Sequence, residues 1–249
     1  DDNCASQGED RHDMQHLLGL PAETLLNKFG SGKHAPGSGS AAALMGLLSA
    51  KLVLTVGHLT LIRNEYERHH PEIKAACDRI QTFVVPRLER LFQEDAEVFD
   101  NVIAARRARD GASEPREKRR LGEAALEHLK IATAIPFNIA EACLELIDLA
   151  ARVFDGGFKG ARGDTGAALS SAVAGVLASV FVINLNLKSF RGSYWAREQR
   201  RQCDELQARV AEKYEGALTR VVKLRAEDIT ALAALDSQDL IAALARGTR

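Results

Sequence analysis

The sequence predicts an all-α protein, on the basis of its composition and of two long apolar segments. Only 5% of the 249 residues are aromatic and 6 are proline, whereas alanine and leucine supply most of the hydrophobic 46%. Alanine and leucine favour helices, while β-branched and aromatic residues favour strands. Residues 41–62 and 165–186 are small and apolar almost throughout, which is typical of closely packed central helices.

Charge and cysteine content argue against several functional classes. With 33 basic and 34 acidic residues the formal net charge is −1, so we expect no nucleic-acid partner. The 4 cysteines are far apart, without a CxxC pair, which predicts neither a zinc site nor a disulfide framework. Residues 1–13 are polar and do not resemble a secretory signal, so we expect a cytoplasmic protein.

Proline and glycine divide the chain into helical stretches. We expect a flexible N-terminal segment, residues 1–20, and a single helical domain, residues 21–249, because no linker separates two domains. The expected helices are 21–30, 41–62, 71–109 with a kink at Pro86, 116–154 with Pro136 inside, 165–186, a helix from 194 onward and a short one over 229–244.

The uncharged segment 165–186 is long enough to span a bilayer, so a membrane helix is one interpretation. Its serines and asparagines, and the lack of aromatic residues flanking it on both sides, disfavour that interpretation. We therefore expect a helix buried in a bundle or at a subunit interface, and no membrane partner.

Asp95 is a candidate for catalysis because it interrupts an apolar stripe. Leu91 lies four residues before it and Phe99 four after it, so both share its helix face. Burial against apolar neighbours raises the pKa of a carboxyl group toward the range where it exchanges protons near neutral pH. An aspartate that only hydrogen-bonds a neighbouring helix would give the same pattern, and the residues alone leave both interpretations open.

A glycine- and serine-rich loop, residues 30–40, precedes the first apolar segment. The free N–H groups and positive dipole end of a helix that starts here would receive an anion, with Lys33 and His34 as further donors. Ser38 or Ser40 is placed to cap that helix. The spacing of a P-loop is absent, and a flexible loop before an ordinary helix is the alternative.

Four other polar residues lie in or beside the apolar segments. Lys51 and His58 are two helical turns apart and should share a face. They either line a polar pocket or are a snorkelling lysine and a core histidine. Asn186 ends the uncharged segment, where its amide would bind a ligand or a helix end. Asp164 follows a glycine-rich loop and is a good helix N-cap.

Taken in order, six short motifs resemble the cyclodeaminase/cyclohydrolase family. This family includes the cyclodeaminase domain of formiminotransferase-cyclodeaminase and stand-alone methenyltetrahydrofolate cyclohydrolases. The motifs are Ala35-Pro36-Gly37-Ser38-Gly39-Ser40-Ala41-Ala42, His58-Leu59-Thr60 with Tyr66-Glu67, Asp95-Ala96-Glu97-Val98-Phe99, Ile135-Pro136 with Ala140-Glu141, Gly163-Asp164 and Asn186-Leu187. Their order and spacing over most of the chain argue against chance.

The resemblance implies long antiparallel helices, a homodimer, and a tetrahydrofolate derivative as substrate with no metal or other cofactor required. It assigns the catalytic aspartate to Asp95. It implies that Gly37, Ser38, Gly39 and Ser40 bind the substrate and that Asp164 and Asn186 line the pocket. Beside these we expect substrate-binding roles for Lys33 and Pro36 of the same loop, and for Lys51 and His58, where this chain departs from the family pattern. The acidic glutamyl tail of the substrate would suit the helix start, with Lys33 or Lys51 as its counter-charge.

The implied chemistry suits a carboxyl group with a raised pKa. In cyclodeamination N10 of formimidoyltetrahydrofolate attacks the formimidoyl carbon, so a base must take a proton and an acid must help ammonia leave. In cyclohydrolysis the same group would activate the water that adds to the methenyl carbon. The chain contains no transferase domain, which favours a free-standing cyclohydrolase. The alternative is a non-catalytic helical module that binds a small anionic ligand or a protein partner.

Overall fold

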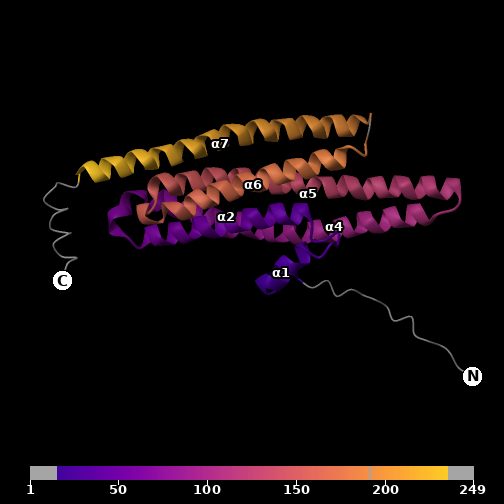
Figure 1. Ribbon diagram of the computed structural model, residues 1–249, viewed down its shortest axis with the longest axis horizontal. Helices are drawn as coiled ribbons and strands as arrows, with labels where there is room; N and C mark the ends of the chain where they lie inside the picture. The colour runs from indigo at the N-terminus through magenta and orange to yellow at the C-terminus, as the bar shows by residue number, and fades with distance from the viewer. Residues whose placement is uncertain (1–15, 191, 235–249) are drawn as a thin grey trace, which may run out of the picture.

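The computed structural model describes residues 16–190 and 192–234, with the side chains of 221–234 left out. Figure 1 shows an elongated bundle of helices, and the described part of the chain contains no strand. The all-α prediction is confirmed. The α-helices are α1 (Ala22–Phe29), α2 (Ser38–Leu61), α3 (His70–Arg79), α4 (Val85–Gly111), α5 (Pro115–Gly156), α6 (Arg162–Leu187) and α7 (Tyr194–Ala234). Three short segments are 3-10 helices: η1 (Leu17–Gly19), η2 (Asn64–His69) and η4 (Lys159–Ala161). The segment η3 (Ile80–Val84) is a π-helix.

Most helices follow the predicted stretches, and the prolines explain their local form. Helices α2 and α6 coincide with the two apolar segments. Pro86 lies in the first turn of α4, where a missing N–H costs little, and the π-helical η3 precedes it. No separate helix begins near residue 229, because α7 continues to Ala234. Residues 235–249 and 1–15, which include most of the predicted flexible segment, lie outside the described residues.

Two predicted N-caps are wrong. Helix α2 begins at Ser38 with Gly37 as its N-cap, and no side chain of its own caps it. Helix α6 begins at Arg162, so Asp164 lies inside the first turn. The chain therefore enters both helices earlier than the side-chain pattern indicates.

Helices α2, α4, α5 and α6 form the core, in which α2 and α5 each pack against α4 and α6. Helices α2 and α6 are antiparallel, since Ser171 Oγ donates to the Met45 carbonyl at 2.9 Å. Small residues permit the close approach. An added Cβ would lie 2.9 Å from Cys143 Sγ at Gly46 and 2.8 Å from it at Gly175. Glycine at both positions is therefore a condition of this packing.

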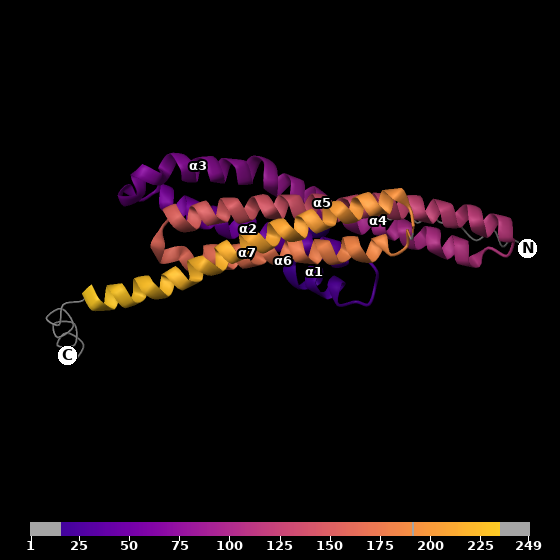
Figure 2. The same cartoon turned by 90° about the horizontal axis from the view of Figure 1, so that it is seen from above.

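The hairpin of α4 and α5 reaches beyond the start of α2, as Figure 2 shows. Gly39 of α2 faces Asp95 of α4. Helix α4 nevertheless continues to Gly111, about 24 Å further at 1.5 Å per residue. One end of the bundle is consequently built from α4, α5, the end of α6 and the start of α7, without α2.

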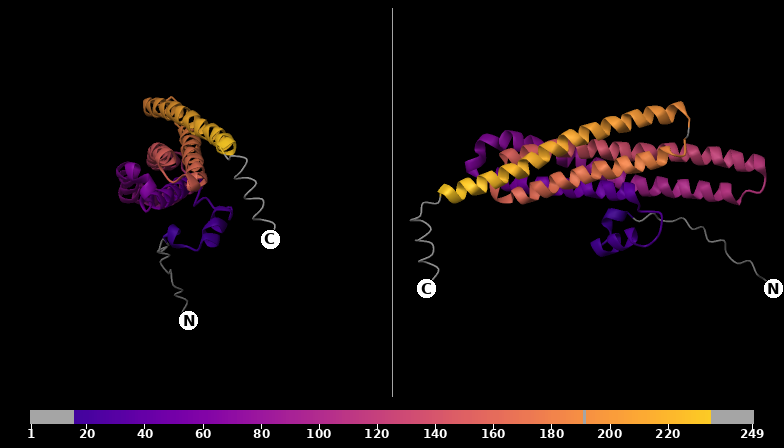
Figure 3. Two further views of the ribbon diagram at one scale, coloured as in Figure 1. Left: turned by 90° about the vertical axis from the view of Figure 1, so that its left-hand side faces the viewer. Right: turned by 45° about the horizontal axis from the view of Figure 1, so that its top comes forward.

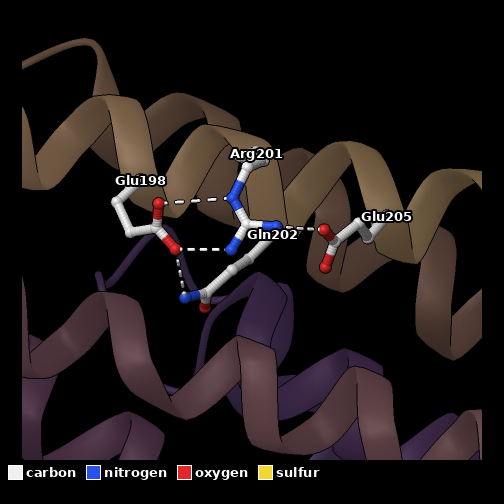
Figure 4. Close-up of polar contacts among 4 residues, drawn as sticks. All are labelled: Glu198, Arg201, Gln202 and Glu205. Atoms are coloured by element: carbon white, nitrogen blue, oxygen red, sulfur yellow. Dashed lines mark hydrogen bonds and ion pairs between the residues drawn. The ribbon is translucent and has the colours of Figure 1, made fainter.

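Helix α7 lies over α6 and α5 (Figure 3). Buried Leu206 and Val210 attach it to the core. Its ion pairs with α5 are Arg209–Glu141, Lys213–Asp148 and Arg220–Asp155. On its exposed face Arg201 binds Glu198 and Glu205 one turn away on either side (Figure 4), a pattern typical of a solvated helix surface.

Two helical stretches, Ser38–Leu61 and Lys159–Leu187, have the length and composition to cross a bilayer. Within the chain, 61% and 50% of their most apolar windows are buried. Core helices of globular bundles have the same composition, and the structure places both stretches in the core.

Candidate active site

The candidate active site lies where α2 begins beside α4. Asp95 is buried, with 9% of its surface exposed. Its Oδ2 accepts two hydrogen bonds from Ser40, one from the backbone N–H at 2.7 Å and one from Oγ at 2.8 Å. Ser40 is the third residue of α2, so its N–H has no partner inside the helix. The carboxylate from α4 therefore takes the role of a capping side chain for α2.

Gly39 makes room for that carboxylate. A Cβ at this position would lie 2.0 Å from Asp95 Oδ1 and 2.8 Å from Oδ2. Buried Leu91 and Phe92 belong to the same face of α4. The prediction that Asp95 lies on the buried apolar face is confirmed, and any residue larger than glycine at position 39 would displace it.

Burial raises the pKa of Asp95 above its ordinary value. The two hydrogen bonds from Ser40 oppose this effect because they stabilise the charged form. The net direction is upward, so the group accepts and returns a proton closer to neutral pH than an ordinary aspartate. The structure confirms that Asp95 bonds a neighbouring helix, and its role in catalysis stays a prediction.

Of the predicted loop residues, Gly39 and Ser40 contact Asp95. Pro36 is buried, and the Gly37 carbonyl accepts the Ala41 N–H at 2.9 Å as the helix begins. Ser38 is exposed in the first turn, and Lys33 is exposed in the loop before it. The segment that leads into α2 therefore has exposed polar side chains at Lys33 and Ser38 and a buried one at Ser40.

Lys51, His58 and Asp164 lie away from Asp95 within this chain. Lys51 and His58 are exposed on α2, about 16 Å and about 27 Å along the helix from Ser40. The interpretation of His58 as a core histidine is wrong. Asp164 is half-buried in the first turn of α6, which lies beside the C-terminal half of α2 because the two helices are antiparallel.

Asn186 lies in the opposite direction along the bundle. It is buried, with 8% of its surface exposed. Gly175 of the same helix contacts Ala42, and Asn186 is eleven residues further, about 16 Å toward the end of the α4–α5 hairpin. It therefore lies past the start of α2, on the side of Asp95 where α2 no longer covers α4.

Sequence reasoning missed how Asp95 is held. It assigned Ser40 to the substrate, whereas both Ser40 donors bond Asp95 in the structure. It also missed Gln93, whose Oε1 accepts the Leu17 N–H at 3.0 Å and fastens η1 to α4. No local pattern marks either role, because each partner is more than fifty residues away in the chain.

The described residues include three cysteines, which, like possible metal ligands, are further candidates for chemistry. Cys77, Cys143 and Cys203 are buried and unpaired. Burial raises the pKa of Cys143 to about 12, so it stays a thiol that packs between glycines. Within residues 16–190 and 192–234, no group of three His, Cys, Asp or Glu residues is placed to hold a metal ion.

The fold and the site define a class of all-helical proteins in which a buried acid caps the start of a glycine-rich helix. The family model described as formiminotransferase-cyclodeaminase matches residues 21–205 of this chain. The chain belongs to this family, which confirms the resemblance found in its motifs.

Relatives and a solved structure agree with this assignment. A methenyltetrahydrofolate cyclohydrolase from Methylorubrum extorquens is 30% identical over 186 residues, 75% of this chain and 88% of that protein. A formimidoyltransferase-cyclodeaminase from Sus scrofa is 27% identical over 192 residues. The match covers 77% of this chain and 35% of that protein, about a third of its length. The crystal structure of formiminotetrahydrofolate cyclodeaminase from Thermotoga maritima has a TM-score of 0.72 at 19% identity, covering 84% of this chain and 98% of that chain. This last similarity supports the fold.

Proposed function

We propose that this protein is a folate one-carbon enzyme, a methenyltetrahydrofolate cyclohydrolase or a formimidoyltetrahydrofolate cyclodeaminase. The observation that carries the proposal is the buried carboxyl group of Asp95, held by Ser40 at the start of a glycine-rich helix. Family membership supports a tetrahydrofolate derivative as substrate. Of the two curated relatives described above, the cyclohydrolase has the higher identity, 30% against 27%, so we place that activity first.

In cyclohydrolysis Asp95 accepts a proton from the water that adds to the methenyl carbon. Asp95 then gives this proton to the ring nitrogen that leaves as one C–N bond breaks, and the hydroxyl proton is released to solvent as the formyl C=O forms. In cyclodeamination Asp95 takes the proton from N10 as N10 bonds the formimidoyl carbon, and returns a proton to the departing ammonia. A carboxyl group with a raised pKa serves both as base and as acid in these steps, and Ser40 holds Oδ2 while Oδ1 lies against Gly39.

A turnover assay on both folates tests the proposal. The wild type should consume methenyltetrahydrofolate, measured as loss of its absorbance, or release ammonia from formimidoyltetrahydrofolate. Asp95→Asn should lower the rate by about 100-fold or more, since a general acid–base group contributes that much.

Glu94→Gln is the matched control, because Glu94 is the adjacent acid and pairs with Arg90 at 2.8 Å on the surface. A wild-type rate equal to that of buffer on both substrates would reject the enzyme. Stabilisation by folate without turnover would support the non-catalytic binding module instead.

We also propose that the protein is a homodimer that pairs through α2 and α6. Exposed apolar side chains gather on these adjacent helices, with Phe181 exposed by 78% and Leu185 by 64%. Met45, Leu48 and Leu177 extend the same surface. Large exposed apolar patches mark protein interfaces. In a two-fold symmetric dimer the same patch of both subunits would form the interface.

Such a pairing bears on the three predicted residues that lie far from Asp95. A two-fold axis near the middle of α2 sets the C-terminal half of one α2 beside the N-terminal half of the other. His58 of one subunit would then approach the Asp95 site of the second subunit, whereas Lys51 would lie near the axis, about 16 Å along α2 from Ser40. The substrate-binding role of His58 thus depends on the dimer.

Light scattering coupled to gel filtration tests the dimer. The wild type should have twice the mass of one chain, and Phe181→Glu with Leu185→Glu should give a folded monomer. Phe83→Glu is the control, because Phe83 is an aromatic residue of η3 that is 44% exposed outside this surface. A monomeric wild type would reject the pairing.

A further inference from the structure

A basic hollow lies at the end of the α4–α5 hairpin, outside the site described above. It has a volume of about 490 Å³ and is bordered by Arg106 and Arg109 of α4, Arg119 of α5 and Ser189 after α6. Glu123 is the one acidic residue that lines it. Its size is in the range of pockets that take small molecules, and three guanidinium groups indicate an anionic ligand.

Two of these arginines are available for such a ligand. Arg109 pairs with Asp110 at 2.8 Å. In the described part of the chain, no carboxylate forms an ion pair with Arg106 or Arg119, and Arg106 interacts with Asp110 only at longer range. Arg106 is half-buried, and a partly buried charge attracts an opposite charge more strongly than one in bulk water does. A guanidinium group also offers paired N–H donors that match a carboxylate.

The hollow lies on the same face of α4 as Asp95. Arg106 is eleven residues beyond Asp95, which is about three helical turns and about 16 Å. Half-buried Phe99 lies between them. Because α2 begins beside Asp95, it does not extend over this part of α4 (Figure 1). Ser189 lies three residues after Asn186, so the end of α6 borders the same stretch.

We propose that Arg106 and Arg119 form the subsite for the carboxylates at the glutamyl end of a tetrahydrofolate whose reacting carbon lies at Asp95. This inference rests on the folate function proposed above and names the residues that select the tail of the substrate. In a folate the p-aminobenzoyl ring joins the reacting end to the glutamate. Asp95, Phe99 and Arg106 follow one another along α4 in the matching order of acid, aromatic surface and cation.

Lys51, one of the two lysines predicted from the sequence as the counter-charge to the tail, lies on the other side of Asp95 along the bundle. Helices α2 and α4 are antiparallel, since Gly39 faces Asp95 and Gly46 faces Leu88. Moving from Ser40 to Lys51 therefore leads away from Arg106. One extended substrate bound within a single chain cannot reach both cations from Asp95.

Steady-state kinetics with methenyltetrahydrofolate carrying one or three γ-linked glutamates tests the subsite. For the wild type we expect a lower KM with three glutamates than with one. Arg106→Ala should raise the KM for the triglutamate about ten-fold, the usual value of a lost charge-assisted hydrogen bond. Its kcat should stay within about two-fold, because the lost contact is remote from the reacting atoms. The advantage of the triglutamate should also shrink at high ionic strength.

Arg107→Ala is the matched control for net charge. Arg107 is an exposed arginine one residue further on α4, about 100° around the helix and outside the lining of the hollow. It should leave the ratio of the two KM values unchanged. Inorganic phosphate tests for a general anion site, and competition by phosphate as strong as by a tri-γ-glutamate peptide would overturn the assignment to the tail.

The outcomes separate this inference from the proposed function. Turnover by the wild type with an unchanged KM ratio in Arg106→Ala and Arg119→Ala would overturn the subsite and keep the folate function. If neither substrate is turned over, calorimetric titration with tri-γ-glutamate decides. Absence of binding overturns the subsite. Binding that is lost in Arg106→Ala and kept in Arg107→Ala supports it without the enzyme activity.

Discussion

Helices α2 and α6 begin in similar ways but satisfy their first turns differently. Both are small-residue core helices packed against each other, and neither has a side-chain cap of its own. Helix α6 carries Asp164 in its first turn, whereas the first turn of α2 contains no acidic residue. The N–H of Ser40 in α2 is met instead by Asp95 from α4 at 2.7 Å.

The difference explains why Asp95 is buried and Asp164 is only half-buried. A negative charge near the start of a helix is favourable in either case. Asp164 is supplied locally and stays half-buried. Asp95 comes from another helix, so it must lie between α2 and α4, and burial raises its pKa. A cap supplied through tertiary structure thus produces an acid with altered chemistry.

The largest effect is expected from closing the space that α2 leaves for Asp95. Gly39→Ala places a Cβ 2.0 Å from Asp95 Oδ1, so activity should fall by about 100-fold or more. Stability should fall by about 1–3 kcal/mol through overpacking. Gly163→Ala is the counterpart in α6, at the same second position of the helix with nothing within 4 Å of the new Cβ. It should be neutral or slightly stabilising in thermal melts, and equal losses in both variants would contradict the comparison.

Asp95→Asn should raise stability at neutral pH even as it removes activity. The pKa of Asp95 is raised in the folded protein, so folding favours the protonated form. The stability that this gives is present below the pKa of an unfolded aspartate and is lost as pH rises through the folded value. Asparagine can still accept the Ser40 N–H without a buried charge. Melting temperatures across pH should show a gain at pH 7 that shrinks in acid, and a loss at pH 7 would contradict the role of burial.

Ser40→Ala should shift the pH dependence of activity. It removes one of the hydrogen bonds that stabilise the charged carboxylate, so the pKa of Asp95 should rise further and the acidic limb of kcat/KM should move to higher pH. Ser49→Ala is the control, because Ser49 is buried in the same helix and its Oγ has no hydrogen-bond partner among the described residues. Ser49→Ala should keep the wild-type pH dependence of kcat/KM. If the acidic limb does not shift in Ser40→Ala, Ser40 has only a packing role.

The smallest effect is expected at the start of α6. Asp164→Asn removes the negative charge from the first turn and should lower stability by about 0.3–1 kcal/mol, the usual strength of such a charge with the helix dipole. The loss should decrease in high salt. Denaturant titrations at two ionic strengths measure it, and a gain in stability like that expected for Asp95→Asn would erase the distinction between the two acids.

The sequence predicted those features that depend on neighbours along the chain. Spacing at three and four residues placed Asp95 on the buried face of its helix, and small residues marked α2 and α6 as core helices. The N-cap predictions failed, because Gly37 and Ala161 are the N-cap residues, and Ser38, Ser40 and Asp164 lie inside the first turns. Lys51 and His58 lie on the same helix as Ser40, but about 16 Å and about 27 Å further along it. Within one chain neither residue therefore lies beside Asp95. The basic hollow also escaped prediction, since Arg106 and Arg119 belong to different helices.

The sequence by itself determined the helices, their apolar faces, and the acid on one of them, because periodicity and propensity act over a few residues. Tertiary structure alone decided that Asp95 meets Ser40, that Gly39 makes room for it, and that α2 begins beside Asp95 while α4 runs on. Those outcomes depend on the register between helices distant in sequence. Register is set by the summed packing of the whole core, in which glycines such as Gly46 and Gly175 fix how closely the helices approach.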